Sequence, residues 1–129
     1  MGYYCSMITL RELDEADLRQ TIRDGEFTKE IRGSAPYVVI ILSQGWCGEW
    51  KILYARLKKV SGWDQSHRPD IDIRWALYDR LPCMKEFMEF KETIWNNDLI
   101  PYLRYYGDGE LIATSNFVME KELFSILGV

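Results

Sequence analysis

The fold of this chain is decided by residues 37–51, which read Tyr37-Val38-Val39-Ile40-Ile41-Leu42-Ser43-Gln44-Gly45-Trp46-Cys47-Gly48-Glu49-Trp50-Lys51. The first six residues are apolar without alternation, which is typical of a central strand covered by helices on both faces. After the short link the hydrophobic period changes, because Trp50, Leu53 and Leu57 recur at helical spacing. We therefore predict a buried strand over 37–42, followed by an amphipathic helix that reaches about Val60.

Further strands and helices are predicted on both sides of this stretch. Asp14 is a suitable N-cap for a helix that Gly25 interrupts, and the segment 61–70 is polar and predicts a loop. Gly107-Asp108-Gly109 favours a hairpin turn. The remaining predicted elements are a strand over Met7–Leu10, a short helix over Phe27–Ile31, a strand over Ile71–Tyr78, a helix after Pro82, hairpin strands over Tyr102–Tyr106 and Glu110–Thr114, and a last helix over Val118–Leu127.

This order of elements predicts an α/β fold. A strand–helix–strand unit gives a parallel pair, and the later hairpin adds an antiparallel pair. We expect one central mixed β-sheet of four to five strands, flanked by helices on both faces. The 129 residues suit a single domain over 1–129, in which residues 1–6 form a flexible tail.

Composition excludes several classes of function. The net charge is −4 and the basic residues are scattered, which argues against a nucleic-acid partner. Tyr37–Leu42 is the longest apolar run, far too short to span a membrane. Three widely spaced cysteines, Cys5, Cys47 and Cys83, and the single His67 predict no metal site. No phosphate-binding glycine loop follows a strand, so we expect no cofactor. The lack of a secretory signal and the free thiols suggest a cytoplasmic location.

Several motifs, taken together in their order and spacing, resemble the thioredoxin-like superfamily. Trp46-Cys47-Gly48-Glu49-Trp50-Lys51 resembles the active site Trp-Cys-Gly-Pro-Cys-Lys. Ile100-Pro101-Tyr102 is similar to the Ile-Pro-Thr in which the proline is cis, and Gly107–Glu110 is similar to the family's hairpin. The likeness runs from about Met7 to Leu127. It implies the thioredoxin fold, with the groove shaped by Trp46, Gly48, Trp50, Ile100 and Pro101.

The departures from the family's pattern bear on function. Trp50 stands in place of the second cysteine, and Glu49 replaces the proline between the two cysteines. The family's buried aspartate corresponds to Ile41, and its small glycine before the last helix corresponds to about Asn116. Without a second thiol, a mixed disulfide at Cys47 needs an outside thiol for its release. Dithiol disulfide reductase activity is therefore not expected.

Cys47 is the candidate nucleophile, because it stands at the predicted start of a helix. Unpaired backbone N–H groups and the helix dipole favour a thiolate there. Lys51 would add positive charge, whereas Glu49 would disfavour the thiolate, so the sign of the combined effect stays open. The alternative is that Cys47 is a small buried hydrophobe. We expect it to be accessible.

Two hypotheses about function remain, and whether the chain is an enzyme stays open. In the first, Cys47 is a monothiol site that forms mixed disulfides with protein or glutathione thiols in cell redox homeostasis. In the second, the domain is a redox-inactive binding module that uses the groove beside Pro101, where the backbone of Ile100 would pair with an extended peptide. Trp46 either shapes the rim of that groove or only covers the strand end.

The other chemistry-bearing residues have simpler interpretations. Cys83, beside Pro82, is expected to be structural. Asp70 and Asp72 are expected to be solvated carboxylates, and His67 a solvated residue of the polar loop. The charged residues over Lys85–Glu92 predict a solvent-facing helix surface.

Overall fold

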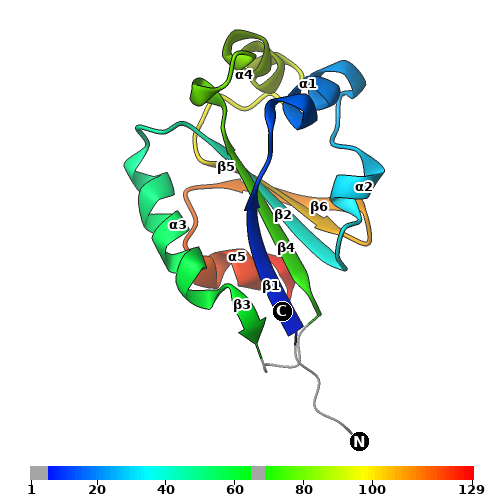
Figure 1. Ribbon diagram of the computed structural model, residues 1–129, viewed down its shortest axis with the longest axis vertical. Coiled ribbons are helices and arrows are strands. Elements are labelled where there is room, and N and C mark those ends of the chain that lie inside the picture. Colours follow the sequence, from blue (N-terminus) through cyan, green and yellow to red (C-terminus); the bar gives the residue numbers. More distant parts are fainter. Residues whose placement is uncertain (1–5, 65–68) are drawn as a thin grey trace, which may run out of the picture.

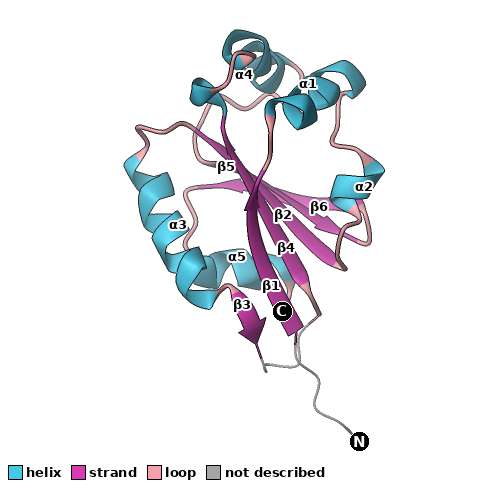
Figure 2. Cartoon of the chain, viewed as in Figure 1, coloured by secondary structure: helices cyan, strands magenta, loops and turns pink. Residues whose placement is uncertain are grey.

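The structure is a computed structural model that describes residues 6–64 and 69–129. Its centre is one mixed six-stranded sheet with the strand order β3-β1-β4-β2-β5-β6. Helices cover both faces of the sheet, as Figures 1 and 2 show. The predicted α/β fold class is therefore confirmed.

The elements follow the predicted order along the chain. The strands are β1 (Ser6–Glu12), β2 (Tyr37–Ser43), β3 (Gly62–Asp64), β4 (Ile71–Leu77), β5 (Tyr102–Gly107) and β6 (Glu110–Asn116). The helices are α1 (Glu15–Asp24), α2 (Lys29–Arg32), α3 (Gly48–Val60), the short 3-10 turn η1 (Tyr78–Arg80), α4 (Met84–Thr93) and α5 (Glu120–Leu127).

The sheet differs from the predicted four to five strands by the short edge strand β3. It lies inside the segment 61–70 that polarity assigned to a loop, and it pairs antiparallel with β1. The pairing partner, not the local pattern, makes this a strand, because Gly62 and Asp64 have low strand propensity. Ser6 also belongs to β1 and is buried, so it is not part of a flexible tail. Residues 1–5 and His67 lie outside the described residues.

Strand β2 is a central strand of the sheet. It pairs parallel with β4 and antiparallel with β5, and its residues Val38–Leu42 are fully buried. Alternate side chains enter two separate cores. Val39 and Ile41 pack with α3 and α5, whereas the other three face α1, α2 and α4. This two-sided burial explains why the sequence of β2 is apolar without alternation.

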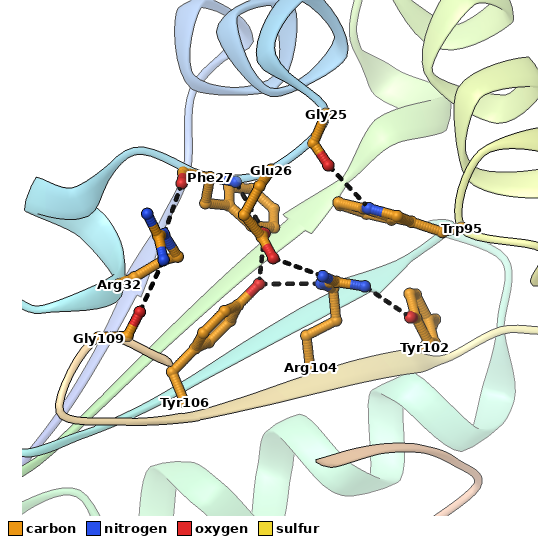
Figure 3. Close-up of polar contacts among 9 residues, drawn as sticks. All are labelled: Gly25, Glu26, Phe27, Arg32, Trp95, Tyr102, Arg104, Tyr106 and Gly109. Carbon is orange, nitrogen blue, oxygen red and sulfur yellow. Dashed lines mark hydrogen bonds and ion pairs between the residues drawn. The ribbon is translucent and has the colours of Figure 1, made fainter. Parts of the chain in front are cut away.

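A buried ionic cluster anchors the segment between α1 and α2 to strand β5 (Figure 3). The guanidinium of Arg104 donates to Glu26 Oε2 at 2.6 Å and to the hydroxyls of Tyr102 and Tyr106, each at 2.9 Å. It also lies over the ring of Trp95, 4.1 Å from the centroid. Burial raises the pKa of Tyr106, so its hydroxyl stays protonated and donates to Glu26 Oε1 at 2.6 Å.

Asp72 is buried, so its expected solvation is wrong. Its carboxylate accepts hydrogen bonds from the side chains of four residues: Thr9, Arg11, Ser34 and Arg74. Burial alone would raise the pKa of Asp72, but these hydrogen bonds outweigh burial and lower the pKa to about 2. The carboxylate therefore ties together β1, β4 and the segment after α2.

Candidate functional site

The register of three strands brings the predicted site together at one end of the sheet. Tyr102 of β5 pairs with Leu42 of β2 on one side and with Asn116 of β6 on the other. The three segments just beyond these residues therefore leave the sheet at the same end. They are the link 43–47, residues 99–101 and residues 117–119.

Cys47 lies at this end of the sheet, but the structure buries it. It is the N-cap residue of α3, as expected, and its side chain is only 2% exposed. Its thiol donates a hydrogen bond to Oε2 of Glu49, with a sulfur–oxygen distance of 3.5 Å. The expectation that the sulfur is accessible is wrong in this conformation.

Trp50 fills the core in place of the second sulfur of a dithiol site. Its indole is buried in the same apolar cluster as Cys47. The ring centroid lies 5.1 Å from that of Tyr54 and 5.3 Å from that of Trp75, which forms a three-ring cluster between α3 and β4. Trp50 is thus a packing residue and does not line the surface of a groove.

Two other residues of the predicted site make few contacts. Gly48 begins α3, and a Cβ added there would meet nothing within 4 Å, so no close approach requires a glycine. The side chain of Lys51 is exposed, and among the described residues it makes no hydrogen bond or ion pair with Cys47 or Glu49. Lys51 therefore makes no direct side-chain contact with the sulfur, and Gly48 has no side chain to make one.

Cys83 cannot serve as a second thiol for Cys47. It is buried at the start of α4, in the core on the opposite face of the sheet. Burial, followed by the nearby charge of Glu15, raises the pKa of the Cys83 thiol. The sheet stands between the two sulfurs, so a bond between them would require the fold to open.

Several apolar side chains are exposed at this end of the sheet. Trp46 is 68% exposed, and its Nε1–H donates to Oε1 of Gln44 at 2.6 Å. Phe117, with a positive φ of 54°, is 51% exposed, and Leu99 is also exposed. The peptide bond before Pro101 is cis. We call the surface formed by Trp46, Leu99, Phe117 and the half-buried Ile100, together with the buried Pro101 of the cis bond, the groove face.

Sequence reasoning missed Leu99 and Phe117. The available signal was their position, since Leu99 lies just before one predicted hairpin strand and Phe117 just after the other. The backbone N–H and carbonyl of Ile100 make no hydrogen bond to any described residue. Both groups therefore lack a partner within the described chain, as pairing with an extended peptide requires.

A network of hydrogen bonds holds the segment that precedes Pro101. Lys91 of α4 is buried and donates through Nζ to the carbonyl oxygens of Asn97 (3.0 Å) and Leu99 (2.8 Å) and to Asn97 Oδ1 (3.2 Å). Asn116 donates to the carbonyl oxygen of Pro101 at 2.8 Å and accepts from Asn97 at 3.1 Å. Burial lowers the pKa of Lys91 to about 8. Lys91 thus follows the inner spacing of α4, whereas the solvent face predicted for this helix is formed by the exposed Lys85, Glu86, Glu89 and Glu92.

Neither a metal-binding cluster nor a membrane-spanning helix occurs within residues 6–64 and 69–129. No group of three or more His, Cys, Asp or Glu side chains is placed there to hold a metal ion. Within the same ranges, no helix is long and apolar enough to cross a bilayer.

Comparisons with solved structures identify the fold. Thioredoxin f2 of Chlamydomonas reinhardtii superposes with a TM-score of 0.60 at 19% identity, covering 92% of this chain and 94% of that one. Thioredoxin O1 of Arabidopsis thaliana gives 0.60 at 11% identity, with 95% and 96% covered. Reduced glutaredoxin C1 of Populus tremula x tremuloides gives 0.51 at 18% identity, with 88% and 83% covered. No protein-family model matches the sequence, and no curated protein does.

These matches cover most of this chain and most of each structure compared with it. The chain is therefore a thioredoxin-fold protein, as the resemblance of its motifs implied. At these identities the likeness concerns the fold and says nothing of the chemistry at Cys47.

Proposed function

We propose that this thioredoxin-fold protein is a binding module that holds an extended segment of a partner protein on its groove face, without disulfide turnover. The observation that carries the proposal is the burial of Cys47, 2% exposed and hydrogen-bonded to Glu49, beside the exposed indole of Trp46. The apolar side chains of Trp46, Leu99 and Phe117 reach solvent, whereas the sulfur of Cys47 is covered.

The groove face offers both elements of peptide recognition. Exposed aromatic side chains such as Trp46 and Phe117 supply most of the energy of typical interfaces. The unpaired backbone groups of Ile100 supply hydrogen bonds that fix an extended chain. The contacts of Lys91 and Asn116 hold the segment 97–101 in place beforehand, which reduces the entropy lost on binding.

A second candidate function is monothiol exchange at Cys47, with a protein or glutathione thiol as partner. Its support is the position of the sulfur at the N-terminus of α3, where backbone N–H groups favour an anion. In such a step the thiolate of Cys47 attacks one sulfur of a partner disulfide, a mixed disulfide forms and the other partner sulfur leaves as a thiolate. Glutathione must then displace Cys47, since Trp50 carries no thiol. Both functions suit a reducing compartment such as the cytoplasm.

One experiment separates these functions: the rate of Cys47 alkylation by iodoacetamide between pH 5 and 10, in the variant Cys5→Ser/Cys83→Ser. For the binding module, we expect native Cys47 to react at least about tenfold more slowly than the same thiol in urea. A thiol that reacts as fast as a free cysteine, with half-ionisation well below pH ~8.5, would refute the binding-module proposal and support exchange.

The binding itself is tested with a displayed library of linear peptides selected on the native protein. We expect Trp46→Ala and Phe117→Ala each to weaken a selected peptide by about tenfold or more. Ile112→Ala is the matched control, because Ile112 is an exposed apolar residue of β6 near the opposite end of the sheet. Peptides that bind both groove variants as tightly as the control would rule out this surface.

A further inference from the structure

An exposed arginine, Arg80, borders the groove face on the side of strand β4. Ser43 of β2 pairs with Leu77 of β4, so the turn η1, which ends at Arg80, leaves the sheet at the same end as the link 43–47. Strands β4, β2 and β5 are neighbours in that order, so η1 and residues 99–101 flank the link on opposite sides. Arg80 thus extends the groove face towards β4.

The guanidinium of Arg80 lies against Gly45, the residue before Trp46. A Cβ added at Gly45 would lie 2.6 Å from Nε and 2.7 Å from Nη2 of Arg80, closer than Cβ atoms come to other atoms in proteins. Glycine at this position therefore leaves the space that the guanidinium occupies. Because Trp46 follows directly and is exposed, the positive charge lies one residue away from the indole of the groove face.

Hydrogen bonds hold η1 against the link. The N–H of Gly45 donates to Asp79 Oδ1 at 2.8 Å, and the side-chain amide of Gln44 donates to the hydroxyl of Tyr78 at 3.2 Å. Gln44 also accepts from the indole of Trp46 at 2.6 Å. The backbone that carries the arginine is therefore held next to the indole before a partner binds, which reduces the entropy lost on binding.

Arg80 has no counter-ion within the described chain. Its guanidinium makes no hydrogen bond or ion pair to a described residue. The neighbouring carboxylate of Asp79 accepts from Gly45, and Glu49 at the start of α3 accepts from Cys47. The guanidinium donors can therefore bind a ligand, and their planar arrangement matches a carboxylate, which accepts two N–H groups at once.

We propose that Arg80 binds a carboxylate side chain of the segment on the groove face, so that the partner is an acidic segment with an apolar residue for Trp46. This inference rests on the proposed binding function and adds the chemistry of the partner. Strands β4 and β5 are two strand spacings apart, or about 10 Å, which is the length of about three residues of an extended chain. One short linear segment is therefore long enough to reach both Arg80 and Ile100.

Peptides selected on the native protein test the proposal, with affinities measured by fluorescence anisotropy. We expect Asp or Glu to be enriched at one position of the selected peptides. Arg80→Gln is expected to weaken such a peptide by about fivefold or more, and to leave unchanged the affinity of an analogue with Asn or Gln at that position. Gly45→Ala keeps every charge but displaces the guanidinium, so it is expected to weaken the acidic peptide and not the amide analogue.

The matched control is Lys59→Gln, which removes the same charge from an exposed position about 16 Å along α3 from Gly48 and is expected to change neither affinity. The proposal is overturned if the selected peptides lack an acidic position, or if Arg80→Gln weakens the acidic peptide no more than its amide analogue. In both cases, peptides that still require Trp46 and Phe117 leave the proposed binding function standing. Peptides that bind Trp46→Ala and Phe117→Ala as tightly as wild type overturn both.

Discussion

Replacing Asp72 by asparagine tests the account of the buried charge cluster. Hydrogen bonds from four side chains hold the pKa of Asp72 at about 2, against an ordinary value of 3.8. A group with a lowered folded-state pKa stabilises the protein above its unfolded pKa, and that stability is lost as the pH falls through the folded pKa. At 1.36 kcal/mol for each pKa unit, the charge contributes about 2 kcal/mol at pH 7.

We therefore expect Asp72→Asn to lower the free energy of unfolding by about 2 kcal/mol at pH 7. The difference from wild type should fall to roughly half at pH 3, and to a few tenths of a kcal/mol at pH 2. Urea unfolding at several pH values between 2 and 7 measures it. Asp108→Asn is the control, because Asp108 is exposed in the hairpin turn and its positive φ suits asparagine. A loss that is the same at pH 3 and pH 7 would refute the charge-based explanation.

Three further predictions follow from packing and charge. Burial lowers the pKa of Lys91 to about 8, so the unfolded chain binds the lysine proton more tightly than the folded one. The free energy of unfolding of wild type should therefore rise by up to about 3 kcal/mol between pH 8 and 10.5. Urea titrations of Lys91→Met should not show this rise. Trp50→Cys should cost about 3–5 kcal/mol in thermal unfolding, because it empties the space between Tyr54 and Trp75. Gly48→Ala should leave the melting temperature within a few degrees of wild type, whereas Gly25→Ala, at φ 83°, should lower stability by about 1 kcal/mol.

Local patterns predicted the elements well where each residue type has a single physical reason for its place. Asp14 caps α1 through its side chain, with Asp17 completing the capping box, and Gly25 ends the helix in the left-handed conformation. Asp108 and Gly109, both with positive φ, form the hairpin turn. These features depend on contacts within a few residues, so the sequence carries the whole of their explanation.

The candidate site was predicted only in part. The position of Cys47 as the N-cap of α3 was predicted, because it depends on the order of a strand and a helix. Its burial was not, since this depends on the contact with Glu49 and on how the link 43–47 folds over the end of the sheet. Leu99 and Phe117 were missed because exposure of a single apolar residue has no periodic signal.

The sequence by itself determined the α/β class, the central strand β2, the order of the elements and the absence of a second thiol beside Cys47. Only the tertiary structure decided that Cys47 is covered, that Asp72 and Lys91 are buried charges, and that Cys83 lies across the sheet from Cys47. The physical reason is range: hydrophobic period and capping act between near neighbours, whereas burial and the pKa of a side chain are set by residues that are distant in sequence.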